Sequence, residues 1–257
     1  MNRILAFFVI LFFSSLGHVN GSGEFPKLDI YMEEWDPFQF EDESGEVKGF
    51  AVDLLDMMLK DVNSMQSKSD FKFIPWARLV ANLKRKDTLG FSMLKTPERE
   101  GMYQWIGPFH TINNYVIVKK YSALTKESFN SGNNVTAATV IGDASVNNIR
   151  SLGVNEKNIY KVSNIESTIR MLDRGRVDII VDNWENFRAL AIKLGIDFSK
   201  YKRLINFGGN DIYFVLSRNT DPEIVGKLQL SFEKIKVSSQ FKDLLKKYKL
   251  GLQRSSK

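Results

Sequence analysis

The amino-acid sequence predicts an α/β protein made of two strand–helix series, each of which forms one lobe. Short apolar runs alternate with stretches in which apolar residues recur at helical spacing, as buried strands and amphipathic helices require. A polar segment at residues 122–134 lacks both patterns and separates the two series. Alternation of this kind favours parallel sheets with right-handed crossovers, and two such units leave a crevice between them.

The first series opens with a βαβ unit. The helix that follows this unit, at residues 76–86, ends in Lys84, Arg85 and Lys86, cations that suit the negative end of a helix dipole. We expect strands and helices in alternation, beginning with a strand, at residues 28–32, 52–62, 71–74, 76–86 and 88–92. A β-branched run at residues 111–118 then leads out of this lobe.

The second series repeats the alternation, and the chain then returns to the first lobe. We expect strands at residues 136–141, 159–162 and 177–181, each followed by a helix, at residues 146–152, 165–174 and 184–194. A last strand at 212–216 and two helices at 222–237 and 239–248 complete the chain. The predicted first lobe is therefore residues 22–118 with 211–257, the second is 119–210, and two hinge crossings join them.

Residues 1–21 have the features of a secretory signal. Arg3 gives a positive start, an apolar run follows at residues 4–13, and Val19-Asn20-Gly21 gives a small-residue cleavage site. Cleavage after Gly17 and an uncleaved anchor are alternatives. The apolar run is shorter than the roughly 20 residues that span a bilayer. We expect an exported protein with no stable membrane insertion after cleavage.

Composition excludes several classes of function. The chain has no cysteine, which rules out a lipid-anchoring cysteine, a disulfide scaffold and thiolate metal sites. Its net charge of +6 is dispersed, and the densest basic cluster, residues 242–249, alternates with apolar residues as in an amphipathic helix. We therefore expect no nucleic-acid partner, no metal and no cofactor, and a monomer that binds a small molecule.

Arg99 is the first candidate binding residue. Its segment, Lys95 to Glu100, follows the apolar run 89–94, with Thr96 as a candidate N-cap and Pro97 at the first helical position. The guanidinium of Arg99 therefore lies just past a strand end, and its planar donors match a carboxylate. The alternative is an ordinary arginine on a solvated surface.

Asp182 is the second candidate. It stands at the C-terminal end of the predicted strand 177–181, where ligands bind in open α/β sheets. The alternative is that Asp182 caps the helix that follows, because aspartate is a preferred N-cap.

Four motifs in compatible order resemble one family: the bacterial extracellular solute-binding proteins of family 3, periplasmic proteins that serve polar amino acid uptake. The motifs are Trp35-Asp36-Pro37-Phe38, Gly49-Phe50-Ala51-Val52-Asp53-Leu54, Thr96-Pro97-Glu98-Arg99 and residues 173–182. The resemblance implies a type II periplasmic binding protein fold that closes on a small solute in the periplasm. It further implies that Arg99 holds the ligand α-carboxylate and Asp182 the α-amino group.

The resemblance suggests roles for further side chains. Trp35 aligns with an aromatic of the first loop and Trp76 with a residue that packs on the ligand side chain, although core packing is the alternative for both. Ser92 offers a hydroxyl near the arginine motif. Arg78 is a candidate for an acidic group on the ligand, or it pairs with a carboxylate such as Asp53.

Two departures from the family pattern concern the ligand. Leu94 stands where many relatives place a hydroxyl, and Gly142-Asp143-Ala144-Ser145 stands where relatives have Gly-Thr-Thr or Gly-Ser-Thr. The N-terminus of the helix predicted after Ser145 favours an anion. Asp143 can cap this N-terminus from within the protein, which leaves less positive charge there for a ligand carboxylate. These departures place the chain in a divergent branch whose ligand need not be a standard amino acid.

The leading functional hypothesis is a non-enzymatic periplasmic protein that captures a small polar solute by lobe closure and delivers it to an inner-membrane ABC permease. One alternative is a soluble sensor for a membrane signalling receptor. Another is a lyase-type enzyme on the same fold, for which acid and base candidates are few. His110 is the only histidine outside the predicted signal, and the nucleophile-elbow and zinc-protease motifs are absent.

Overall fold

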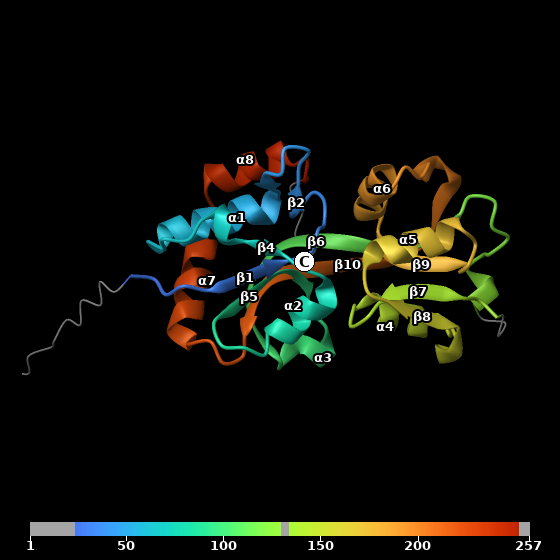
Figure 1. Cartoon of the computed structure of the whole chain (residues 1–257), viewed down its shortest axis with the longest axis horizontal. Coiled ribbons are helices and arrows are strands. Elements are labelled where there is room, and N and C mark those ends of the chain that lie inside the picture. Colours follow the sequence, from blue (N-terminus) through green and yellow to red (C-terminus); the bar gives the residue numbers. More distant parts are fainter. Residues whose placement is uncertain (1–23, 130–133, 252–257) are drawn as a thin grey trace, which may run out of the picture.

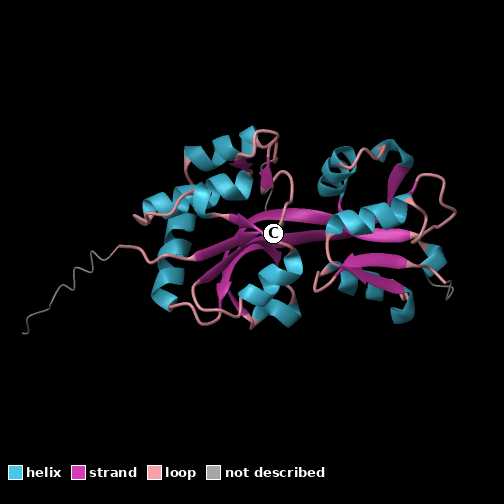
Figure 2. Ribbon diagram, viewed as in Figure 1, coloured by secondary structure: helices cyan, strands magenta, loops and turns pink. Residues whose placement is uncertain are grey.

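A computed structural model describes residues 24–129 and 134–251, so the predicted signal at 1–21 lies outside the described residues. Two lobes lie side by side along the long axis of the molecule, and the strands β6 (Tyr103–Lys119) and β10 (Tyr201–Ser217) run from one lobe into the other (Figure 1). The alternation of helices and strands predicted from the sequence is visible in both lobes (Figure 2).

The first lobe contains both the start and the end of the described chain. Its strands are β1 (Asp29–Met32), β4 (Lys72–Phe73) and β5 (Thr88–Leu94), with a small hairpin of β2 (Phe40–Glu41) and β3 (Val47–Lys48). Its helices are α1 (Phe50–Asp61), α2 (Trp76–Asn82), α3 (Pro97–Glu100), α7 (Pro222–Lys236) and α8 (Ser239–Lys247). The second lobe has strands β7 (Ala137–Val140), β8 (Ile159–Val162) and β9 (Ile179–Asn183), and helices α4 (Ser145–Ser151), α5 (Ile165–Asp173) and α6 (Trp184–Lys193).

One eight-stranded sheet passes through both lobes in the order β4-β1-β5-β10-β6-β9-β7-β8. The outer strands of each lobe pair in parallel, as helical crossovers require, whereas β10 pairs antiparallel with β5 and β6, and β6 with β9. The prediction of a mixed α/β fold is confirmed. The carboxyl ends of β1 and β9 consequently face the junction between the lobes.

The hinge differs from the sequence-based expectation. We expected short strands at 111–118 and 212–216, but β6 and β10 are each 17 residues long and pair along their whole length. Gly107-Pro108 and Gly208-Gly209 are turn-forming pairs, and the two strands accommodate them as shifts in register, one of them between Asn206 and Gly209.

The expected lobe boundary lies at residue 118. Residues 114–117 already pair with β9, and Val116 and Val118 pack in the core of the second lobe. We therefore propose that the outward crossing lies near Ile112–Asn114.

Each lobe has its own core. In the first lobe, Phe50, Leu54 and Met58 of α1 are fully buried against the sheet and α7. In the second, neighbouring residues of one strand face opposite sides of the sheet: Ile179 packs in the cluster that includes Ile149 of α4, and Ile180 packs in the cluster that includes Phe187 of α6. Helices on both faces leave each lobe a compact unit that can move about the hinge strands.

Buried ionic contacts attach α8 to the first lobe. Asp53 of α1 accepts hydrogen bonds from Lys247 and Tyr248, each at 2.7 Å, and from Lys68. Burial raises the pKa of Asp53, but these hydrogen bonds outweigh it and keep the pKa below its ordinary value. Arg78 is not among these partners, so the suggested Arg78–Asp53 pair is not formed.

Gly49 fixes the loop that carries Trp35. The backbone of Gly49 has φ +133°, and a Cβ there would lie 2.2 Å from the Phe38 carbonyl oxygen. This close approach lets Phe50 and Ala51 donate their amides to the carbonyls of Pro37 and Phe38, both at 2.9 Å. The first turn of α1 therefore holds the loop in place.

We predict that Gly49→Ala destabilises the protein by about 2 kcal/mol or more, because a side chain there needs both a strained φ and displacement of backbone. The same change at Gly226, in an exposed turn of α7 with open space around it, should stabilise by about 0.5 to 1 kcal/mol. Urea unfolding of both variants measures the difference. Equal effects at the two positions would contradict this account of Gly49.

Candidate functional site

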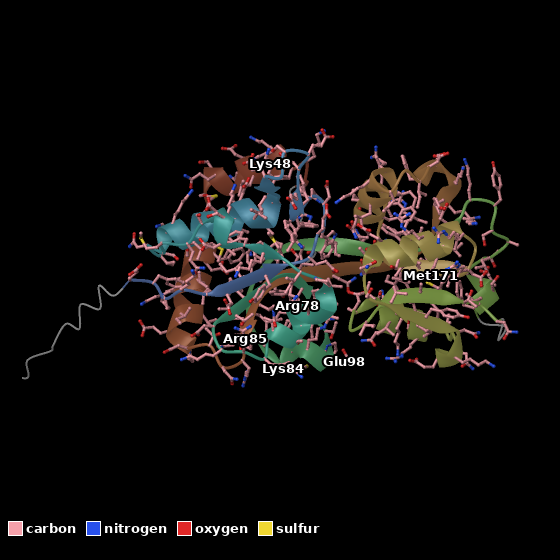
Figure 3. The ribbon with its side chains drawn as sticks, viewed as in Figure 1. Lys48, Arg78, Lys84, Arg85, Glu98 and Met171 are labelled. Atoms are coloured by element: carbon pink, nitrogen blue, oxygen red, sulfur yellow. The ribbon has the colours of Figure 1, made fainter. Side chains whose placement is uncertain are left out.

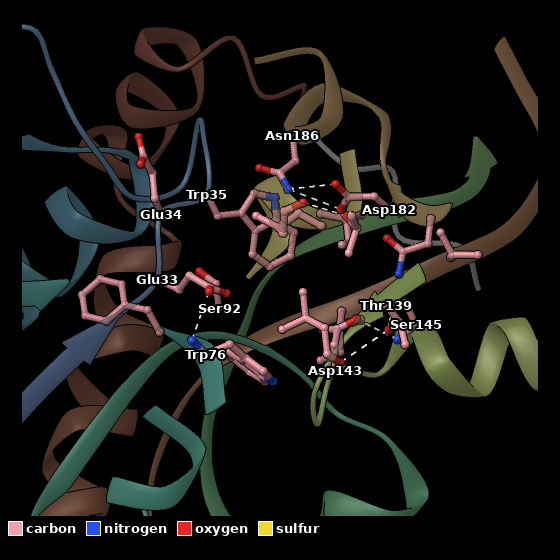
Figure 4. A pocket seen from close by; sticks show the side chains of 18 of the residues that line it. Glu33, Glu34, Trp35, Trp76, Ser92, Thr139, Asp143, Ser145, Asp182 and Asn186 are labelled. Carbon is pink, nitrogen blue, oxygen red and sulfur yellow. Dashed lines mark hydrogen bonds between the residues drawn. The ribbon is translucent and has the colours of Figure 1, made fainter. Parts of the chain in front are cut away.

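A cavity of about 820 Å³, including space open to solvent, lies between the lobes and collects nearly all of the predicted site residues (Figure 4). Its walls come from the ends of β1, β5 and β9, from α2 and α3, and from the β7–α4 loop. The predicted residues on these walls are Trp35, Trp76, Ser92, Leu94, Arg99, Asp143, Ser145 and Asp182.

Arg99 bridges the two lobes. It lies in α3, directly after β5, and donates from Nη1 to the Leu94 carbonyl at 3.2 Å and from Nη2 to the Gly142 carbonyl at 2.7 Å in the second lobe. Its guanidinium lies over the Trp76 ring, 5.3 Å from the ring centroid. Two of its five N–H groups are used in this way, so three can meet a ligand carboxylate. The surface alternative for Arg99 is therefore wrong.

Asp182 ends β9 and points into the cavity. Its Oδ1 accepts from the Asn183 amide at 2.8 Å, and its Oδ2 accepts from Nδ2 of Asn186 at 3.0 Å. The cap of α6 is instead Asn183, whose side chain accepts from the Asn186 amide. Burial raises the pKa of Asp182 to about 8, and the charges of Asp143 and Glu33 add to the rise.

Glu33 is a cavity residue that the sequence analysis missed. It follows β1, and its Oε1 accepts from the Trp76 amide at 3.0 Å. Burial raises the pKa of Glu33 to about 7, and the charge of Asp143 contributes. The signal was available, because Glu33 stands just past the carboxyl end of a strand, as Asp182 does. Asn186 was also missed, one helical turn after Asp182.

Asp143 and Ser145 line the wall contributed by the β7–α4 loop. Asp143 Oδ1 accepts from the Ser145 amide at 2.8 Å, which is the internal use of this carboxylate that the sequence suggested. The Ser145 hydroxyl is 2.7 Å from that of Thr139. Asp143 also interacts electrostatically with Arg99 and partly balances its charge.

The two tryptophans form walls and also pack against other aromatic or apolar side chains. Trp76 is only 7% exposed, and Trp35 meets Phe38 edge-on with ring centroids 5.3 Å apart. Both indole Nε1 atoms are buried without a hydrogen-bond partner in the described chain. Ser92 differs, because its hydroxyl already donates to Gln39 Oε1 at 2.6 Å. The indole N–H groups therefore have no acceptor within the described residues.

Arg78 does not reach the cavity. It is exposed on α2, where the Trp76 side is buried, and two residues along a helix turn a side chain by roughly 200° (Figure 3). His110 is also absent from the cavity wall. It packs against Phe38 and Phe50 near the hinge, and burial lowers its pKa to about 4.

A second contact between the lobes closes the mouth of the cavity. Lys193, at the end of α6, donates to both carboxylate oxygens of Glu34 at 2.6 Å. Together with the bond from Arg99 to Gly142, this pair holds the lobes against each other. The carboxylate of Glu34 is thereby matched within the protein.

Comparisons with known proteins agree with this arrangement. Residues 29–251 match the model of the bacterial extracellular solute-binding proteins, family 3. A protein named "Probable histidine-binding protein" from Neisseria gonorrhoeae is 27% identical over 224 residues, which cover 84% of this chain and 80% of that protein.

Two solved structures share the fold. The arginine-, lysine-, histidine-binding protein ArtJ from Geobacillus stearothermophilus has a TM-score of 0.74 at 20% identity, over 90% of this chain and 97% of that one. A histidine kinase sensor domain with similarity to periplasmic binding proteins also has a TM-score of 0.74, at 12% identity, over 86% of this chain and 95% of that one. Across residues 24–129 and 134–251, no helix combines the length and apolar character that crossing a membrane requires.

We predict that Asp182→Asn stabilises the ligand-free protein increasingly as pH rises from 4 to 8. The pKa of Asp182 in the folded protein, about 8, lies above its ordinary value of 3.8, so the stability that its protonated form contributes is lost as pH rises through 8. Asparagine at position 182 stays neutral at every pH. The side chain of Asn186 can turn so that its buried Oδ1, which has no partner within the described residues, accepts a hydrogen bond from the new amide.

Thermal unfolding at several pH values measures this effect. The same substitution at Asp243, an exposed residue of α8, serves as the control for loss of a carboxylate outside the cavity. A constant difference for Asp182→Asn would show that Asp182 is ionised in the empty cavity.

Proposed function

The chain belongs to the bacterial extracellular solute-binding proteins of family 3, and from this premise we propose that it captures an amino acid between its lobes and delivers it to an inner-membrane ABC permease. It is a solute-binding protein with the type II periplasmic binding protein fold that the sequence predicted. One observation supports the proposed ligand above all others: the guanidinium of Arg99 and the carboxyl of Asp182 come from opposite lobes and line the same cavity.

The charges of an amino acid match this pair. Its carboxylate can accept from the free N–H groups of Arg99, and its ammonium can donate to Asp182, whose carboxyl has no cation beside it in the described chain. Burying either ligand charge without a partner would cost several kcal/mol. Because each lobe provides one partner, both charges are matched only when the lobes are closed, which couples binding to closure.

The names of the relatives point to the same class of ligand. One is a histidine-binding protein by name, and another binds arginine, lysine and histidine. We infer that this chain works in the periplasm and meets a membrane permease there. We also infer that it binds without catalysis, because its family is one of solute-binding proteins and the relatives are binding proteins by name.

We predict that Arg99→Ala abolishes amino acid binding with little loss of fold. Removing one member of a charge-assisted pair costs on the order of 2 to 5 kcal/mol, which weakens affinity at least about thirtyfold. Titration calorimetry against a panel of amino acids measures the loss, and Arg78→Ala on the neighbouring helix is the matched control. An unchanged dissociation constant for Arg99→Ala would end the carboxylate assignment.

We also predict that affinity for the amino acid rises between pH 6 and pH 8. The ammonium binds the ionised form of Asp182, whose pKa in the empty protein is about 8, so at lower pH the ligand must displace a proton. Dissociation constants measured across this range should fall about fiftyfold with rising pH. A flat profile would contradict the role of Asp182 as the partner of the ammonium.

A further inference from the structure

Three buried polar atoms on the cavity wall have no hydrogen-bond partner within the described residues. They are the indole Nε1 atoms of Trp35 and Trp76, in the first lobe, and Oδ1 of Asn186, in the second. An indole N–H only donates, and an amide oxygen only accepts. Because a buried polar atom without a partner is costly, a donor and an acceptor left over on opposite lobes of one cavity require an explanation.

Trp35 is the indole on the same side of the cavity as Asn186. Figure 4 shows these two side chains on one side and Trp76 on the other, with Asp143. The Nε1 of Trp76 lies beside the β7–α4 loop, where a Cβ on Gly142 would be 3.9 Å from it. The acceptor on α6 is therefore left for Trp35.

The first lobe fixes the ring of Trp35. Trp35 and Gln39 exchange backbone hydrogen bonds, at 2.7 Å and 2.9 Å, and the ring meets Phe38 edge-on. A ring held in this way cannot turn freely to find an acceptor within its own lobe. Its N–H finds a partner when the second lobe brings one to it.

Asp182 sets the direction of the Asn186 amide. Nδ2 of Asn186 donates to the two carboxyl oxygens of Asp182, at 3.0 Å and 3.3 Å, so that its Oδ1 faces away from Asp182. An ionised carboxylate favours this orientation, because it only accepts hydrogen bonds. A protonated carboxyl also has an O–H to donate, and the unpartnered Oδ1 then turns toward it. The ionisation of Asp182 therefore decides where Oδ1 points.

In the proposed function, the ligand ammonium ionises Asp182. Burial raises the pKa of this carboxyl to about 8, so near pH 6 to 7 it is mostly protonated until a cation binds it. The charged groups on the walls that face it are Glu33 after β1, Arg99 of α3 and Asp143 before α4, with the pair of Glu34 and Lys193 at the rim.

We propose that Asn186 is a positioning residue that links the ammonium site to lobe closure: when an amino acid ionises Asp182, Oδ1 of Asn186 accepts a hydrogen bond from the Trp35 indole across the cavity. The inference rests on the proposed function and adds a contact between the lobes that depends on the ligand. The other polar contacts, from Arg99 and from Lys193, do not involve Asp182.

The indole N–H signals of tryptophan test this bond directly. The chain has 4 tryptophans, so ¹⁵N labelling of tryptophan gives few signals, and loss of one in Trp35→Phe identifies Trp35. Saturation with the amino acid that binds tightest in a calorimetric panel should move this proton signal downfield and slow its exchange with water about tenfold or more. The Trp105 indole, which donates to the Glu100 carbonyl at 3.0 Å, is the internal reference.

The variant Asn186→Leu keeps the approximate size of the side chain and removes its amide. At saturating ligand it should abolish both changes at Trp35, and it should weaken affinity about fivefold or more. Trp35→Phe should then weaken affinity by a smaller factor in this variant than in the unmodified protein, because the two residues share one bond. Asn147→Leu, on α4 and away from the cavity wall, is the matched control and should leave the Trp35 signal responsive.

The outcomes separate the inference from the proposed function. A Trp35 signal that does not respond to bound ligand would overturn the inference, and this measurement needs only the unmodified protein and the assignment. A response that Asn186→Leu leaves intact would also overturn it. In both cases the calorimetric binding of an amino acid would leave the proposed function standing, whereas failure of every amino acid in the panel to bind would remove both.

Discussion

Burial of charge between two lobes is the constraint on which the site depends. The cavity wall holds one guanidinium and the carboxyls of Glu33, Asp143 and Asp182, with Glu34 already matched at the rim. Burial raises the pKa values of Glu33 and Asp182, so each of these two carboxyls needs a partner from the protein, a proton or a ligand. In this sense the ligand supplies the missing counter-charge of the closed form, and without it the pKa values of Glu33 and Asp182 stay raised, at about 7 and about 8.

The hinge links this burial of charge to closure of the two lobes. Because β6 and β10 pass through both lobes as one antiparallel pair, each lobe can keep its own core while the angle between them changes. Arg99 moves with the first lobe and Asp182 with the second, so their separation depends on closure. The polar contacts between the lobes are Arg99 to Gly142 and Lys193 to Glu34, and Val140 of the second lobe also packs in the apolar cluster around Trp76.

The order of elements and the placement of Arg99 and Asp182 could be predicted from the sequence, because strand ends and helix starts follow local rules. The length of the hinge strands β6 and β10 could not be predicted from the sequence. Gly107-Pro108 and Gly208-Gly209 are turn formers in the sequence alone, and their place inside strands follows only from the long-range pairing. The prediction that Arg78 lies at the site was wrong. Arg78 is close to Trp76 in sequence, but the two side chains lie on different faces of α2. Glu33 stands just past a predicted strand, as Asp182 does, and could have been found by that position, whereas its burial beside other carboxyls is created only by the folded chain.

The central claim is that the amino acid replaces protons as the partner of the buried carboxyls, and counting protons tests it most directly. Calorimetric titration of the protein with lysine at pH 7, in buffers of different ionisation enthalpy, gives the number of protons exchanged on binding. The account predicts that protons are released when the amino acid binds, because Asp182, whose pKa is raised to about 8, loses its proton to the ligand ammonium. Binding with no proton exchange, or with uptake, would contradict it.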